Sequence, residues 1–300
     1  MKRITLLLVL VLLLTVINVV SAQKDTKTDT DDMAQGISVN CDDGTSFDNG
    51  VSITVVQMRS GFTYKATAIG IDGFDPVLAV LDAETGTGLC EDDSDGVMEY
   101  SAFLPSGTAD YSEFNAQIEF ANTSDEDFAD ISLVVGGFGN LGGEFFLVLE
   151  GMFVDSENDG AGDPFSVYIT NEMIASEVPL TAYAISADGV IDPLLQLINS
   201  DYEVLLDGDD NPAMCDDMGT EGLCWSDAID MDVDGNGEYD DYYVENTETF
   251  LTLWDTDSYL RLALEEDDAG GYYNFATTSF AQSTDGYYMM VFHVGTSGME

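Results

Sequence analysis

Positively charged residues are scarce in this sequence, which holds 7 lysines and arginines against 58 aspartates and glutamates and has a formal charge of −51 at pH 7. A nucleic-acid-binding protein needs clustered cations that neutralise phosphates, so this charge excludes nucleic acid as a partner. Anionic membrane surfaces and heparin-like polymers are excluded by the same repulsion. The composition is still that of a folded chain, because 45% of the residues are hydrophobic and 11% are aromatic.

Catalytic motifs are also missing. His293 is the single histidine, and it lies in an apolar run near the C-terminus, where a structural role is more typical than a role as general base. The sequence contains no G-x-S-x-G elbow, no H-E-x-x-H pair and no glycine-rich phosphate loop. The abundant carboxylates leave a glycosidase-like acid pair open as an alternative. We therefore expect a non-catalytic protein.

Only one long hydrophobic run is present, from Ile4 to Val20, and it follows the basic start Met1-Lys2-Arg3. The run ends in Ser21-Ala22, which is typical of a signal peptide cleaved after Ala22. A retained membrane anchor is the alternative, because about 17 apolar residues approach the minimum for a span. Cleavage lowers the formal charge from −51 to −53, since Lys2 and Arg3 leave with the segment. We expect a secreted or surface-associated protein without a further membrane insertion.

Cysteine is rare but even in number. Cys215 and Cys224 lie close together in a turn-rich stretch, which leaves Cys41 and Cys90 as the second pair. Three pairings are arithmetically possible, and this one contains the sensible local loop. A zinc site is the competing interpretation, but no histidine accompanies the thiols. Two disulfides agree with export.

Long stretches of helical periodicity are absent, and the apolar residues follow strand patterns instead. Segments that alternate with period two are 51–55, 113–120 and 259–264. Val77–Leu81 and Phe145–Leu149 are continuous apolar runs, as expected of strands covered on both faces. Turn-forming clusters separate the runs at sandwich-like intervals, and 171–176 could form one helical turn. The fold class is predicted to be all-β.

The sequence also repeats itself. Residues 68–93 align with 184–210, so that Asp75-Pro76 falls on Asp192-Pro193. Further on, Phe128 aligns with Phe275 and Gly143 with Gly286, at a larger offset. The second copy must therefore carry an insertion after Asp210.

These features predict two tandem β-sandwiches after a signal peptide. The expected boundaries are 1–22 for the signal peptide, 23–40 for a flexible acidic tether, 41–152 for copy 1, 153–164 for an Asp/Gly-rich linker and 165–300 for copy 2, with the insertion at about 211–246.

The repeated pattern resembles the bacterial pre-peptidase C-terminal domain. It consists of D-P-x-L, a later D-D pair and a glycine that begins an apolar strand. The matching residues are Asp75, Pro76, Leu78, Asp92, Asp93 and Gly143 in copy 1, and Asp192, Pro193, Leu195, Asp209, Asp210 and Gly286 in copy 2. The resemblance implies a jelly-roll-like antiparallel β-sandwich that acts as an accessory binding or processing module, without catalytic residues. The chain departs from the family by having no peptidase domain and an interrupted second copy.

The insertion holds the sharpest local signal, D-V-D-G-N-G-E-Y-D, in which alternate oxygen ligands and glycines can wrap one hard cation. The favoured ligands are Asp232, Asp234, Asn236 and Asp240. The alternative ion-binding register is EF-hand-like, adds Asp230 and ends at Asp241. A third interpretation is a solvated acidic loop that binds no ion. We favour the first register because a strand, Tyr242-Tyr243-Val244, follows the loop and no helix does.

A weaker echo of this calcium pattern lies between the two copies. Its candidate ligands are Asp155, Glu157, Asp159 and Asp163, although a plain linker has the same composition. The Asp92-Asp93 and Asp209-Asp210 pairs are interpreted as turn residues that could join an ion site. Calcium is the expected cofactor.

Aromatic residues in the second half suggest a binding surface. Trp225, Tyr242 and Trp254 are the candidates, because exposed rings stack on sugars or on protein partners. The alternative is that one member of each tyrosine pair simply fills the core. The sequence thus predicts a secreted, calcium-stabilised binding or surface-associated protein whose partner is an unknown protein or polysaccharide. The alternatives are an extracellular hydrolase with an unlocated carboxylate site and a structural cell-surface assembly protein.

Overall fold

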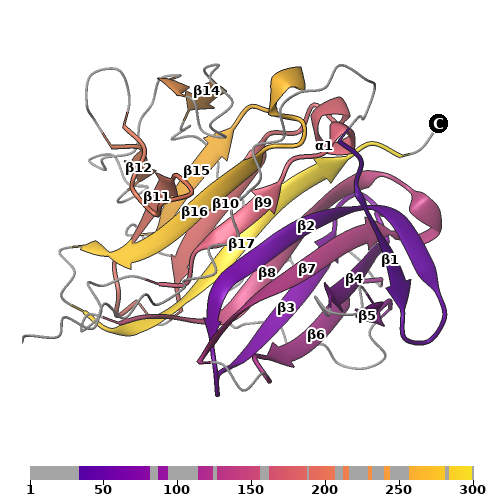
Figure 1. Cartoon of the computed structure of the whole chain (residues 1–300), viewed down its shortest axis with the longest axis horizontal. Coiled ribbons are helices and arrows are strands. Elements are labelled where there is room, and N and C mark those ends of the chain that lie inside the picture. Colours follow the sequence, from indigo (N-terminus) through magenta and orange to yellow (C-terminus); the bar gives the residue numbers. More distant parts are fainter. Residues whose placement is uncertain are drawn as a thin grey trace, which may run out of the picture. The chain divides into compact units, whose positions relative to one another are not determined.

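The computed structural model describes residues 34–81, 87–93, 114–123, 127–155, 162–187, 189–206, 212–215, 229–231, 240–243, 257–280 and 284–298. Within the unit Met33–Glu300, two packed β-sheets hold nearly all of the regular structure (Figure 1). The sequence predicted an all-β fold, and the described structure is mostly β, with almost no helix.

The first sheet has nine strands in the spatial order β1-β5-β4-β7-β2-β9-β16-β11-β12. All of its pairings are antiparallel except that of β1 with β5. In this order the strands are β1 (Ile37–Cys41), β5 (Thr87–Glu91), β4 (Pro76–Leu81), β7 (Phe128–Gly137), β2 (Ser46–Arg59), β9 (Phe165–Tyr168), β16 (Tyr272–Ser279), β11 (Pro193–Ile198) and β12 (Met214–Cys215).

The second sheet has eight strands and is antiparallel throughout. In spatial order they are β13 (Ile229–Met231), β14 (Asp240–Tyr243), β15 (Ser258–Leu262), β10 (Leu180–Ser186), β17 (Gly286–Thr296), β8 (Gly143–Val154), β3 (Thr63–Gly70) and β6 (Ala116–Ala121). Strands β12, β13 and β14 lie in the expected insertion and extend the edges of both sheets.

The strand order repeats in the two halves of the chain. In the first sheet β5-β4-β7-β2 is followed by β9-β16-β11-β12, and in the second sheet β15-β10-β17 is followed by β8-β3-β6. The strands of the second half follow in the reverse spatial order, so that β2 corresponds to β9 and β8 corresponds to β17. The halves meet in the antiparallel pairs β2–β9 and β8–β17. This is the order that a local two-fold axis between the halves produces. Both sheets therefore run without a break from one half into the other.

The strand registers also test the sequence alignment of the repeats. Gly143 begins β8 and Gly286 begins β17, as the alignment requires. The match of Phe128 with Phe275 is wrong, because Leu133 pairs with Val80 in the first half just as Phe275 pairs with Leu197 in the second. Phe128 is 55% exposed and Phe275 is fully buried, so the shared letter did not mark a shared position.

One large hydrophobic core lies between the sheets and draws residues from both halves. Strand β8 is buried on both faces, because Phe145, Phe146, Leu147 and Val148 are all at most 2% exposed. The continuous apolar run in the sequence therefore marked a doubly covered strand, as expected.

A second, smaller core lies beneath β1, which pairs with both β2 and β5. Val39 and Phe47 meet Val77 and Val134 there, and Ile37 packs against them. The expected tether at 23–40 is wrong at its end, because Ile37 already belongs to a strand that covers this core. The apolar residues of the Ile37-Ser-Val39 run are the signal that was missed.

The single turn of helix expected near residue 171 is confirmed as α1 (Asn171–Ala175), with the Thr170 side chain accepting a hydrogen bond from the Met173 N–H. Within the described ranges, the other helical pieces are the 3₁₀ turns η2 (Phe138–Asn140) and η4 (Glu266–Asp268). Among the residues that the structure describes, no helix is long and apolar enough to cross a membrane.

Candidate functional site

A cavity of about 340 Å³ opens at one end of the β8–β17 junction, where Gly143 pairs with Thr296. The first half supplies the turn before β4 and the start of β8, and the second half supplies the turn after α1 and the end of β17. The lining residues are Ile71, Asp72, Gly73, Phe74, Asp75, Leu141, Gly142, Gly143, Glu144, Ser176, Val178 and Thr296.

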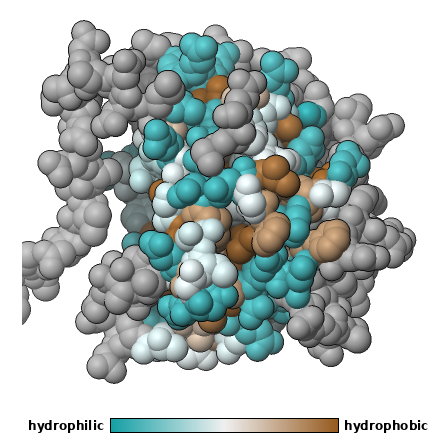
Figure 2. Space-filling view, turned by 90° about the vertical axis from the view of Figure 1, so that its right-hand side faces the viewer, coloured by the Kyte–Doolittle hydropathy of each residue, from teal (hydrophilic) through white to brown (hydrophobic). Residues whose placement is uncertain are grey.

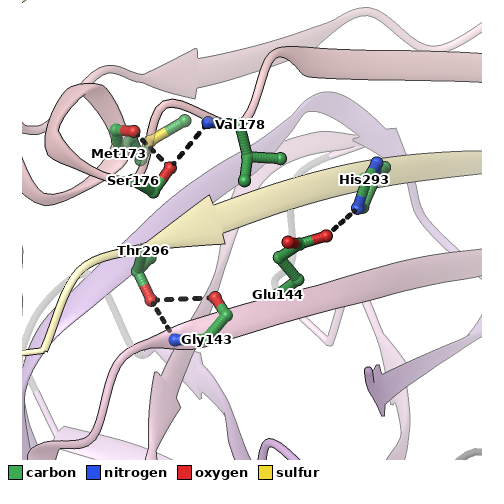
Figure 3. Close-up of polar contacts among 7 residues, drawn as sticks. All are labelled: Gly143, Glu144, Met173, Ser176, Val178, His293 and Thr296. Carbon is green, nitrogen blue, oxygen red and sulfur yellow. Dashed lines mark hydrogen bonds and ion pairs between the residues drawn. The ribbon is translucent and has the colours of Figure 1, made fainter. Parts of the chain in front are cut away.

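Glu144 joins this cavity to the single histidine. The imidazole Nε2–H of His293 donates to Glu144 Oε2 at 3.2 Å, across the β8–β17 pair (Figure 3). The His293 ring also lies 4.8 Å from the ring of Phe146. Burial lowers the pKa of His293, and the Glu144 carboxylate opposes this effect. The pair thus holds a largely neutral imidazole against the sheet.

The two hydroxyl groups in the cavity wall already have partners. Ser176 Oγ donates to the Met173 carbonyl at 2.6 Å and accepts from the Val178 N–H at 3.1 Å. Thr296 Oγ1 donates to the Gly143 carbonyl and accepts from its N–H (Figure 3). Ser176 therefore closes a turn at the end of α1 and is not arranged as a nucleophile with His293.

Asp75 belongs both to the cavity wall and to an acidic cluster. One carboxylate oxygen from each of Asp75, Asp92 and Asp93 lies within 4.8 Å of the others. The Oδ1 atoms of Asp75 and Asp92 are inaccessible to solvent and have no hydrogen-bond partner. Such oxygens are hard ligands that suit a calcium ion.

The electrostatics of this cluster are unfavourable without a cation. Burial, together with the charges of Asp92 and Asp93, raises the pKa of Asp75 to about 6. Burial and Asp93 raise the pKa of Asp92 as well. Three carboxylates packed so closely repel one another, and a divalent cation or a proton relieves that repulsion.

The opposite end of the β8–β17 junction has its own cation. Arg59 Nη1 lies 3.4 Å from Asp155 Oδ2, directly after β8 ends. Asp163 is 5% exposed and accepts a hydrogen bond from the Tyr64 hydroxyl at 3.0 Å. Burial raises the pKa of Asp163 to about 6, although the Tyr64 hydrogen bond and Arg59 oppose the shift.

This arrangement bears on the weaker calcium loop expected from the sequence. Asp155 and Asp163 both interact with Arg59, and Glu157 and Asp159 lie outside the described residues. A guanidinium group thus already supplies positive charge to the two ends of the segment.

The stronger calcium loop lies largely outside the described residues, which include neither Asp232, Asp234 nor Asn236. Its flanks are strands, with Asp230 paired to Asp241 and Met231 to Asp240 between β13 and β14. The expectation that a strand follows the loop is therefore confirmed for the described residues Asp240–Tyr243.

The predicted disulfide between Cys41 and Cys90 is confirmed, with an S–S distance of 2.02 Å. Cys215 is also disulfide-bonded, and its predicted partner Cys224 lies outside the described residues. Because cytosolic thiols are kept reduced, the Cys41–Cys90 bond indicates a non-cytoplasmic compartment.

The aromatic candidates are only partly described. Trp225 and Trp254 lie outside the described residues, and Tyr242 is placed in β14 by its backbone alone. In the pairs Tyr272-Tyr273 and Tyr287-Tyr288 the first member is 49% exposed and the second is fully buried. Alternation between core and surface therefore accounts for these two pairs.

Sequence reasoning missed the cavity and the Glu144–His293 pair, because both form only where β8 and β17 meet. It named Asp92 and Asp93 as possible ion ligands but did not place Asp75 with them. The repeated Asp-Pro motif was the available signal, since it puts Asp75 at the start of β4, beside the end of β5.

Comparison with protein-family models, with curated proteins and with solved structures found no match to this chain.

Proposed function

We propose that this protein is a secreted, non-catalytic β-sandwich module that calcium stabilises and that binds a protein or polysaccharide partner outside the cell or at its surface. The observation that carries the proposal is the cluster of Asp75, Asp92 and Asp93, with its two buried oxygens that lack a partner. The Cys41–Cys90 disulfide and the anionic composition support an extracellular setting rich in ions.

The resemblance to the pre-peptidase C-terminal domain is part of this proposal. It is supported by the recurring strand order and by the positions of its motifs, since Asp-Pro precedes or begins β4 and β11 and a glycine begins β8 and β17. The jelly-roll-like architecture and the role as an accessory module come with it.

Calcium is expected at the Asp75–Asp92–Asp93 cluster and at the Asp232–Asp240 loop. An ion that binds only the folded state raises stability with its saturation. The thermal midpoint should therefore rise by several degrees from excess chelator to millimolar calcium. Overlapping melting curves would contradict the calcium proposal.

Variants separate the two calcium sites. Asp92→Asn with Asp93→Asn should remove the part of the calcium effect that belongs to the cluster, and Asp232→Asn with Asp234→Asn should remove the part that belongs to the loop. Asp201→Asn, which changes an exposed aspartate in the turn after β11, is the control and should retain the full calcium effect. Titration of each variant with calcium by calorimetry counts the sites directly.

The hydrolase alternative has one specific place in the structure, because Asp72, Asp75 and Glu144 share the cavity wall. A glycosidase needs two carboxylates at a suitable separation. Turnover of a panel of polysaccharides that is abolished by both Asp75→Asn and Glu144→Gln would favour it, and binding without turnover favours the module.

A further inference from the structure

The cavity at the Gly143–Thr296 end of the β8–β17 junction carries negative charge without a cation of its own. Asp72, Asp75 and Glu144 line it, and its lining residues include no lysine or arginine. His293, which contacts Glu144, has its pKa lowered by burial and adds little positive charge. The Glu144 side chain is 45% exposed, so its charge is available to a ligand.

Among the side chains that line the cavity, the hydrogen-bonding capacity that remains consists of acceptors. The Ser176 hydroxyl is engaged within the turn after α1, and the Thr296 hydroxyl is engaged with Gly143. Ionised carboxylates only accept hydrogen bonds. A ligand that complements this wall must therefore donate hydrogen bonds and carry positive charge, as ammonium and guanidinium groups do.

The rest of the wall is apolar. Phe74 and Val178 lie in it, and Leu141 at its rim is 66% exposed. Figure 2 shows the side of the molecule that lies to the right in Figure 1. Hydrophobic residues are exposed there among hydrophilic ones, near the middle of the view. Apolar walls beside carboxylates suit an alkyl stem that ends in a charged head.

At the other end of the β8–β17 junction, the chain supplies its own cation next to a carboxylate. There Arg59, on β2, brings its guanidinium to 3.4 Å from Asp155 at the end of β8. In the strand order, β9 and β10 of the second half correspond to β2 and β3 of the first half. The connection between β9 and β10, which supplies Ser176 and Val178, is therefore the counterpart of the short connection between β2 and β3 after Arg59. Arg59 thus provides a positive charge at the Asp155 end of the junction, whereas the residues that line the cavity include no lysine or arginine.

We propose that the cavity binds an alkylammonium group, with the charged head against Asp72, Asp75 and Glu144 and the alkyl stem against Phe74, Leu141 and Val178. A lysine side chain of a partner protein and a free alkylamine share this chemistry. The site shares Asp75 with the proposed calcium cluster, whereas Asp72 and Glu144 lie outside that cluster. Amine binding measured in chelator, with variants of Asp72 and Glu144, therefore separates this proposal from the calcium proposal.

The test uses the whole secreted chain, labelled with ¹⁵N, in chelator and at low ionic strength. Nα-acetyl-lysine N-methylamide is titrated, with n-butylamine as the free-amine arm and the Nε-acetylated lysine derivative as the uncharged control. We expect shifts of the amide signals of Leu141, Gly142 and Gly143 with both amines and none with the acetylated compound. Tighter binding of the lysine derivative assigns the site to a partner's side chain, and equal binding assigns it to free amines.

Variants distinguish amine binding by the carboxylates of the cavity wall from attraction to the net negative charge of the whole protein. Asp72→Asn and Glu144→Gln should each weaken amine binding about three- to tenfold, because each removes one charge next to the ligand. Asp201→Asn removes the same charge elsewhere and should change binding by less than about twofold. Asp72 is exposed, so its variant keeps the test valid if Glu144→Gln disturbs the strand pair. Equal losses in all three variants, or shifts with the acetylated control, overturn the proposal.

Discussion

At the scale of single residues, lysine and arginine are too few to pair with most of the carboxylates. Arg59, Lys65 and Arg261 are the three cations after residue 40. Arg59 pairs with Asp155, and Lys65 Nζ lies 2.6 Å from Glu150 Oε2 between β3 and β8. Burial raises the pKa values of Asp75 and Asp163 to about 6. The charges of Asp92 and Asp93 add to the shift at Asp75, whereas Arg59 opposes the shift at Asp163.

Asp163 should make stability depend on pH. Its pKa is raised above the unfolded value, so its stabilising contribution is fully present below about pH 4 and is lost as the pH rises through about 6. Asp163→Asn keeps an acceptor for the Tyr64 hydroxyl but does not titrate. Relative to the variant, the wild type should lose roughly 2–3 kcal/mol of unfolding free energy between pH 4 and pH 7.

Urea unfolding at several pH values measures this difference. Asp127→Asn, which changes an exposed aspartate, is the matched control and should follow the wild-type profile. Parallel pH profiles for the wild type and Asp163→Asn would show that Asp163 is not the responsible group.

Gly286 and Gly143 have a physical reason to be glycines. A Cβ on Gly286 would lie 2.2 Å from Ile191 Cγ2, and a Cβ on Gly143 would lie 2.4 Å from the Phe74 ring. In each half, the residue before Asp-Pro packs on the first residue of the later strand. Gly286→Ala should cost about 1–3 kcal/mol, and Ile191→Ala in the same chain should recover part of that loss. A double-mutant cycle by chemical denaturation measures the coupling, and simple additivity contradicts the contact.

At the scale of elements, β1 is the strand that the sequence did not predict, because most of it was assigned to the tether. It covers the small core around Val39 and Phe47, and the Cys41–Cys90 disulfide ties its end to β5. A strand of five residues contributes little by itself, so the crosslink and the apolar contacts act together to hold it.

Removal of this disulfide should weaken the small core. The bond closes a loop of 49 residues, and its loss in a Cys41→Ala, Cys90→Ala variant should cost about 2–4 kcal/mol. Hydrogen exchange should become faster in β1 and stay slow in β8 and β17. Unchanged exchange in β1 would mean that packing alone holds the strand.

At the scale of the whole molecule, the two halves share both sheets and one core. The β8–β17 pair joins ten residue partners from Gly286↔Val154 to Thr296↔Gly143, and this junction buries Phe146, Val148 and Phe292. We expect one cooperative unfolding transition by calorimetry, with equal calorimetric and van't Hoff enthalpies. Two separated transitions would indicate halves that fold independently.

The net charge acts at the same scale. A chain with a formal charge of −51 repels itself when screening is weak. The thermal midpoint should therefore rise as sodium chloride increases from about 10 mM to about 500 mM, most steeply at the low end. Sucrose at matched osmolality is the control, and a flat salt response would contradict a dominant role for repulsion.

The sequence by itself determined the mostly-β class, the Cys41–Cys90 pair, the doubly buried strand at Phe145–Leu149 and the repeated motifs. These features follow from local periodicity, turn residues and cysteine spacing, which act over short stretches of chain. It could not place the repeat register at Phe128, the start of β1 or the meeting of Asp75 with Asp92 and Asp93.

Only the tertiary structure decided that the halves join edge to edge in both sheets. That junction created the cavity, the Glu144–His293 pair and the surroundings of Asp163, because each combines residues more than 90 positions apart. Contacts at such separations depend on which strands become neighbours, and no local pattern in the chain records that choice.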